Sequence, residues 1–76
     1  MIPYPPMRLL VEFELEEDGR WIADVTDLPG ALAYGNSRDE ALAAAKALAL
    51  RVLADRIEHG ELPADLPELT FGVRAA

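Results

Sequence analysis

The sequence predicts a small α+β domain in the order β-β-β-α-β, with a four-stranded sheet and one long helix on one face. Hydrophobic and polar residues alternate along the first part of the chain, which is the period of a half-buried strand. From Ser37 onward, apolar residues recur at three- and four-residue spacing, which is the period of a helix. The chain has 76 residues, enough for a single domain and too few for two.

The first strand is expected to start at Arg8. Its apolar residues share one face, and most of its polar residues share the other; the apolar set is Leu9, Val11, Phe13 and Leu15. An Asp-Gly pair at residues 18–19 favours a tight hairpin turn. On the return strand, Trp21 would face the same apolar side and be the largest core residue. Pro29 and Gly30 then indicate a second turn, followed by a short strand over residues 31–34.

The helix is expected to begin at Ser37, because Ser37 and Glu40 have the spacing of a capping box, in which each side chain binds the other residue's free backbone N–H. Its expected core positions include Leu42, Ala45, Leu48 or Ala49, Val52, Leu53 and Ile57. Gly60 would end it, next to His59, whose imidazole suits the negative end of a helix. Residues 69–73 alternate again, and a right-handed crossover would place them parallel in the same sheet.

Residues 1–7 are rich in proline and are expected to form a lead-in arm outside the sheet. They lack a charged segment followed by a continuous apolar stretch, so no signal peptide is expected. The longest apolar stretch is interrupted by Lys46 and is shorter than a membrane span. A cytoplasmic protein that does not enter a membrane is the resulting expectation.

The net charge of the chain favours some classes of binding partner over others. Fourteen acidic residues and seven basic ones give a net charge of −7, and residues 1–30 hold seven of the acids with two bases. Negative potential disfavours direct binding to nucleic acid and favours a basic protein partner. The chain has no cysteine and one histidine, so thiolate metal sites are excluded and no cofactor is expected.

One strand face carries a cluster of acids. Glu12 and Glu14 lie on the polar face of the first strand, and Asp24 on the next strand would join them. Three carboxylates could hold metal ions in a nuclease, although alternating acids are also what the wet side of a sheet carries. The same face bears Ile22, and nothing in the sequence covers it, so a partner patch at Glu12, Glu14, Ile22, Asp24 and Asp27 is the favoured interpretation.

Several runs resemble the HicB antitoxin family. They are Asp18-Gly19 with residues 21–30 (WIADVTDLPG), residues 33–42 (AYGNSRDEAL) and residues 59–63 (HGELP), and the similarity extends over about residues 8–67. The resemblance implies a partial ribonuclease-H-like fold without catalytic activity. It further implies a module that neutralises HicA, a small basic mRNA interferase toxin, by direct binding. Trp21, Pro29, Gly30, Ser37, Glu40 and Gly60 would then be structural.

The chain also departs from the family pattern. Ala31 stands where family members often carry a cysteine, and the C-terminal DNA-binding domain that many members have is not expected in this chain. Two alternatives therefore stay open beside the antitoxin: a HicB-like homo-oligomer, dimer or tetramer, that acts without a toxin, and a metal-dependent nuclease using Glu12, Glu14 and Asp24. The alanine-rich helix and the uncovered sheet face would both permit self-association.

Overall fold

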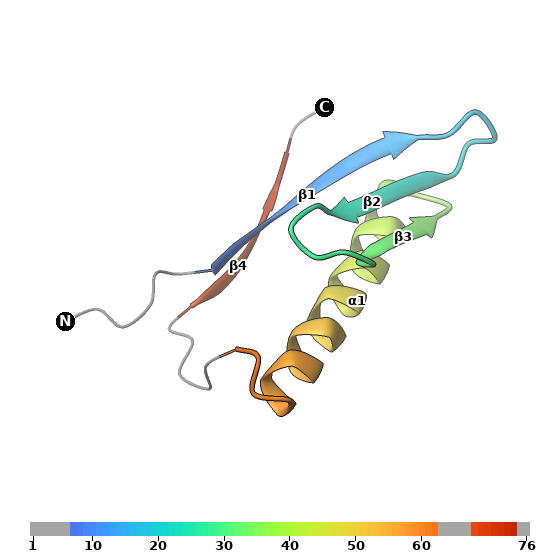
Figure 1. The fold of residues 1–76 in the computed structure, drawn as a ribbon. Coiled ribbons are helices and arrows are strands. Elements are labelled where there is room, and N and C mark those ends of the chain that lie inside the picture. Colours follow the sequence, from blue (N-terminus) through green and yellow to red (C-terminus); the bar gives the residue numbers. More distant parts are fainter. Residues whose placement is uncertain (1–6, 63–67, 75–76) are drawn as a thin grey trace.

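The fold is the α+β arrangement that the sequence predicts. The computed structural model describes residues 7–62 and 68–74. It contains, in order, β1 (Met7–Leu15), β2 (Trp21–Val25), β3 (Leu32–Gly35), α1 (Arg38–Glu58) and β4 (Leu69–Val73). The strands form one sheet in the order β3-β2-β1-β4 (Figure 1). The three strands of the meander are antiparallel, and β4 returns parallel to β1, as expected for a crossover through a helix.

The arm predicted for residues 1–7 is one residue too long. Met7 begins β1, because its N–H donates to the carbonyl of Glu68 at 2.9 Å and it pairs with Leu69 on β4. The prolines of the arm lie outside the described residues. At its other end β1 stops at Leu15, which belongs to the inner face but is 57% exposed. The expected burial of Leu15 is therefore wrong.

The hairpin between β1 and β2 closes through a three-residue loop. The N–H of Glu16 donates to the carbonyl of Arg20 at 2.8 Å, and the N–H of Gly19 donates to the carbonyl of Glu16 at 3.0 Å. Gly19 takes a φ of 89°, whereas no residue other than glycine has a positive φ in the described chain. The turn is thus one in which glycine alone occupies the left-handed region, the usual form of a three-residue hairpin loop.

The helix begins where the sequence predicts, with one difference in its cap. Ser37 Oγ accepts the N–H of Glu40 at 3.1 Å, but the Glu40 carboxylate accepts the N–H of Asn36 at 3.4 Å in place of that of Ser37. At the other end, Gly60 has a φ of 73° and donates to the carbonyl of Ile57, while Glu61 donates to that of Arg56. These two bonds form a Schellman motif, which satisfies the last carbonyls of the helix.

Small residues bring the helix close to the sheet. The buried positions of α1 are Ala41, Ala45, Ala49 and Leu53, spaced four apart. Leu42, Leu48 and Val52 pack at the border of the core, and Ile57, expected inside, is 41% exposed. Trp21 is half-buried and meets Phe13 edge to face, with ring centroids 6.5 Å apart. The fully buried core consists of smaller residues than the sequence alone suggests.

The helix covers one side of the sheet, beneath β2 and β3, and no element within residues 7–62 and 68–74 covers the other side (Figure 1). β4 lies at the far edge, where Lys46 of α1 reaches across and places its ammonium 5.4 Å from the centre of the Phe71 ring. No helix in the described residues has the length and apolar character needed to span a bilayer. Among the described residues, the side of the sheet opposite α1 is available for binding (Figure 1).

Candidate functional site

The candidate site is the sheet face that points away from α1. Pairing in register sets Glu12 opposite Asp24 and Glu14 opposite Ile22. On the other side of β2, Ile22 is opposite Tyr34 and Asp24 is opposite Leu32. Because residues paired across strands share a face, acidic side chains from β1 and β2 lie beside apolar side chains from β2 and β3. We call this set the open face: Leu10, Glu12, Glu14, Ile22, Asp24, Leu32 and Tyr34.

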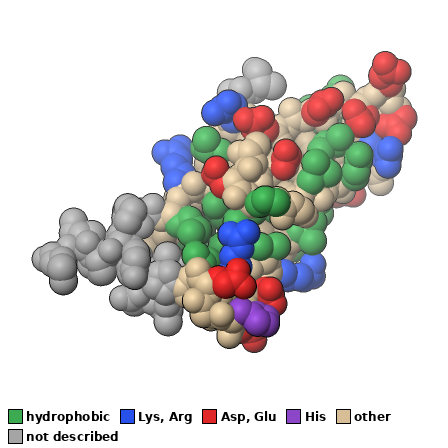
Figure 2. Space-filling model, viewed as in Figure 1, with side chains coloured by type: hydrophobic (Ala, Val, Ile, Leu, Met, Phe, Trp, Pro, Cys, Tyr) green, Lys and Arg blue, Asp and Glu red, His purple; other side chains and the backbone are tan. Residues whose placement is uncertain are grey.

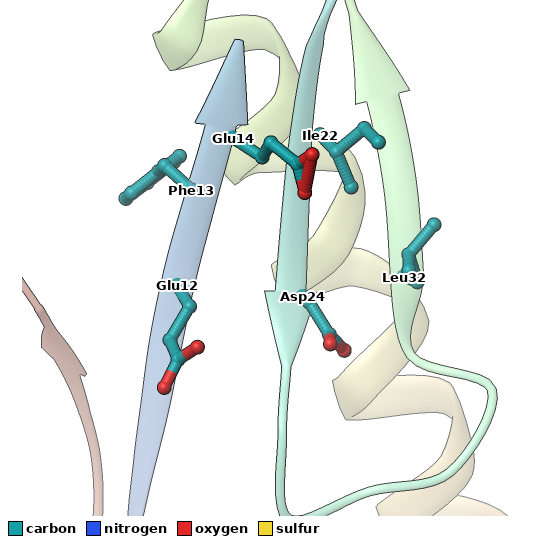
Figure 3. A pocket seen from close by; sticks show the side chains of 6 residues that line it. All are labelled: Glu12, Phe13, Glu14, Ile22, Asp24 and Leu32. Carbon is teal, nitrogen blue, oxygen red and sulfur yellow. The ribbon is translucent and has the colours of Figure 1, made fainter. Parts of the chain in front are cut away.

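A shallow hollow lies in the middle of the open face. It encloses about 150 Å³ and is lined by Glu12, Phe13, Glu14, Ile22, Asp24 and Leu32. Figure 3 views it with α1 behind the sheet: the three carboxylates stand around it, and Ile22 and Leu32 form its side toward β3. The hollow thus combines negative charge with apolar contact area, which suits an amphipathic cationic side chain such as arginine.

Acidic and hydrophobic side chains are also intermixed over a wider area. Figure 2 shows carboxylates beside hydrophobic groups over the strands and at the tip of the hairpin. Leu32 and Tyr34 are 42% and 48% exposed, which is high for large apolar residues. Two arginines border the area: Arg74 lies 3.2 Å from the carboxylate of Glu12, and the Arg20 guanidinium lies 4.7 Å from the centre of the Tyr34 ring.

The structure brings together most of the residues that the sequence singles out. Glu12, Glu14, Ile22 and Asp24 line the same hollow. Asp27 lies apart, exposed in the turn after β2. Leu32 and Tyr34 were missed as site residues, although they occupy alternate positions of a strand that the sequence does predict. That alternation was the available signal.

The three carboxylates of the open face do not form a metal centre. Within residues 7–62 and 68–74, no three side chains of the metal-binding types gather closely enough to hold an ion. Glu12 is instead paired with Arg74. The geometry on which the nuclease alternative depends is therefore not present in this part of the chain.

A second hollow, lined by Glu16, Glu17 and Asp18, lies at the hairpin tip. Here the backbone N–H of Arg20 donates to Oδ1 of Asp18 at 3.0 Å, and the Nε of the Arg20 side chain donates to Oδ2 of Asp18 at 2.8 Å. The backbone hydrogen bond, followed by the guanidinium, holds the pKa of the Asp18 carboxyl below its ordinary value of 3.8. Asp18 therefore stabilises the turn, because its carboxylate already accepts hydrogen bonds from Arg20 within the loop.

The single histidine has a structural explanation as well. The Nδ1 atom of His59 lies 2.7 Å from the carbonyl oxygen of Asp55 and 3.4 Å from its carboxylate. The imidazole is exposed at the C-terminal end of α1 and hydrogen-bonds to the backbone one turn earlier in the helix. Ser37 likewise acts as the N-cap.

Comparisons with protein-family models, with curated proteins and with solved structures found no match to this chain. The open face, its charge and its exposed apolar residues are accordingly the observations on which a function rests.

Proposed function

We propose that the chain is an antitoxin-like binding module of the HicB type. In this proposal it neutralises a small basic mRNA interferase of the HicA type in the cytoplasm by binding the toxin directly. The observation that carries the proposal is the open face, where Glu12, Glu14 and Asp24 surround exposed apolar residues. The motifs that resemble the HicB family point to the same role.

The chemistry of the open face fits a basic protein better than other partners. Its carboxylates would attract a cationic surface and speed encounter, and Ile22, Leu32 and Tyr34 offer apolar area that contact would bury. A nucleic acid would meet like charge, because the chain carries a net charge of −7. A basic ribonuclease surface matches both the charge and the apolar area.

The deciding experiment is inhibition of a purified HicA-type ribonuclease. We expect RNA cleavage to fall to background at one equivalent of this protein, because the partner's basic RNA-binding surface would be covered. Continued cleavage at stoichiometric and higher ratios would overturn the proposal. Binding measured in parallel by calorimetry separates failure to bind from binding that leaves the nuclease active.

A matched pair of variants locates the surface. Glu12→Lys with Glu14→Lys changes the charge of the open face by four, and Glu58→Lys with Glu61→Lys makes the same change at the end of α1. We expect the first variant to lose inhibition at least about tenfold, since interfacial charge pairs contribute more than 1.4 kcal/mol. The second should inhibit as the parent does. Equal behaviour of the two variants would show that net charge, and not the open face, is responsible.

A further inference from the structure

The two edges of the sheet differ in the charges beside them. β3 and β4 are the edge strands, and both lack the charged residues and prolines that usually prevent an edge from pairing with another chain. Beside β3, Asp24 lies opposite Leu32 and Arg20 lies over the Tyr34 ring. One acid and one base therefore flank β3, so this edge favours neither an acidic nor a basic strand.

β4 lies among cations on both faces of the sheet. On the face away from α1, Arg8 is exposed and its guanidinium lies over Gly72, where an added Cβ would be 2.9 Å from Nε. On the face toward α1, the ammonium of Lys46 lies 5.4 Å from the centre of the Phe71 ring. Within residues 7–62 and 68–74, neither Arg8 nor Lys46 forms an ion pair. Both cations can therefore attract an acidic group to this edge.

The hydrogen bonds between β1 and β4 show which backbone groups of β4 point away from the sheet. The N–H of Met7 donates to the carbonyl of Glu68 at 2.9 Å, and the N–H of Arg74 donates to the carbonyl of Val11 at 3.0 Å. The residues of β4 that bond to β1 alternate along the ladder, so they are the even-numbered ones. The residues that direct N–H and C=O outward are Leu69, Phe71 and Val73.

From these observations we propose that β4 binds an extended segment of another protein in which acidic and apolar residues alternate. The segment adds antiparallel to β4 as a fifth strand and exchanges backbone hydrogen bonds with its outward-facing residues. Its apolar residues lie on the α1 side of the sheet, beside Phe71 and Val73, and bury the Val73 side chain, which is 44% exposed. Its acidic residues lie on the other side, beside Arg8, whose guanidinium suits carboxylates.

Charge disfavours a second copy of this chain at the same edge. Two β4 strands that paired antiparallel around Phe71 would bring their Lys46 ammonium groups together on one face and their Arg8 guanidinium groups together on the other. Like charges at short distance repel, and a basic strand from any partner would meet the same repulsion. An acidic strand instead neutralises Arg8, which selects it as the occupant.

This inference goes beyond the proposed function, because the partner has the opposite charge and binds elsewhere on the sheet. A basic ribonuclease would contact Glu12, Glu14 and Asp24 around the hollow. The acidic segment would bind at the edge beyond β1, where Figure 1 shows β4 away from the helix. Failure of either interaction can thus be measured without the other.

Nuclear magnetic resonance of the isotopically labelled full chain tests the site directly. The probe is the end-blocked peptide Thr-Val-Glu-Val-Glu-Val-Thr, and the control is Thr-Val-Lys-Val-Lys-Val-Thr. We expect the glutamate peptide to slow amide exchange at Leu69, Phe71 and Val73, because their N–H groups gain acceptors. The lysine peptide should bind at least about tenfold more weakly. No binding of the glutamate peptide at about 1 mM, equal binding of both peptides, or slowed exchange at β3 in place of β4 overturns the proposal.

Two matched pairs of variants test the contacts. Arg8→Gln should weaken binding of the glutamate peptide at least about threefold, and Arg51→Gln, the same change at an exposed position of α1, should leave it unchanged. Val73→Pro removes an outward N–H and no bond to β1, so it should abolish binding, whereas Val73→Thr keeps that N–H and should bind. Circular dichroism shows that each variant is folded. Equal loss in the two arginine variants, or binding retained by a folded Val73→Pro chain, overturns the proposal.

Discussion

Glu12 and Asp24 lie directly opposite each other on β1 and β2, two carboxylates in neighbouring positions of one sheet face. Like charges in this arrangement destabilise a sheet. Arg74 offsets part of the repulsion through its contact with Glu12 at 3.2 Å, but that ion pair is exposed, and exposed pairs contribute little. The open face thus holds a charge arrangement that weakens the fold and suits a cationic partner.

Replacing one of the two carboxylates should therefore stabilise the isolated chain. We expect Asp24→Asn to raise the free energy of unfolding by about 0.5 kcal/mol, because it removes the cross-strand repulsion and keeps the shape of the side chain. Asp27→Asn is the control, since Asp27 lies in a turn with no carboxylate paired opposite it. Urea denaturation of both variants measures the difference. An equal gain in both would mean that general net charge is the cause.

The order of elements could be predicted from the sequence because each element carries a local signal. Alternation identified β1 and β2, Ser37 with Glu40 marked the start of α1, and Gly60 marked its end. Each of these signals depends only on residues near one another in the sequence, so it can be recognised without knowledge of the tertiary structure. The parallel placement of β4 followed from the handedness of crossovers.

The face of α1 that packs on the sheet could not be predicted in the same way. Leucine and alanine occur around much of the helix, so hydrophobicity alone does not select a side. Close packing selects the side that carries Ala41, Ala45 and Ala49, because these small residues let the helix approach the sheet. The selection depends on the distance between helix and sheet. Leu32 and Tyr34 were missed for another reason: their alternation along β3 was an available signal, but the strand has no charged residue that marks its exposed face.

The alanine stripe should be sensitive to size. Ala45 is fully buried between α1 and the sheet, so Ala45→Leu must push the two layers apart. We expect a loss of about 2 kcal/mol in unfolding free energy, typical of overpacked cores. Ala43→Leu places the same side chain at an exposed position of the same helix and should change stability by less than about 0.5 kcal/mol. Thermal or urea unfolding compares them, and equal effects would contradict close packing at Ala45.

Gly35 should be a second position that tolerates no added atom. A Cβ there would lie 2.8 Å from the Glu40 carbonyl carbon and would also collide with the backbone N of Ala41. Backbone at the start of α1 cannot move without disturbing the cap, so we expect Gly35→Ala to cost about 3 kcal/mol. Gly72→Ala is the control, because its Cβ would approach the end of the flexible Arg8 side chain at 2.9 Å. A Gly35→Ala chain as stable as Gly72→Ala would refute this contact.

The hairpin should make stability depend on pH in the acid range. The backbone N–H of Arg20, and next its guanidinium, lowers the pKa of Asp18 in the folded chain below the ordinary value of 3.8. A carboxyl with a lowered folded pKa stabilises the fold above its unfolded pKa, and this contribution is lost as the pH falls through the folded value. Asp18→Asn should therefore flatten the decline of the urea midpoint between about pH 5 and about pH 2.

Glu17→Gln is the control for this change, because it removes the adjacent carboxylate of the same loop and leaves both Asp18–Arg20 hydrogen bonds in place. The urea midpoint of this variant should decline with acid as steeply as that of the parent. If Asp18→Asn and Glu17→Gln flatten the curve equally, the acid sensitivity comes from the summed charge of the hairpin tip. If Asp18→Asn alone flattens it, the hydrogen bonds from Arg20 are the cause, since those bonds favour the ionised carboxylate in the folded chain alone.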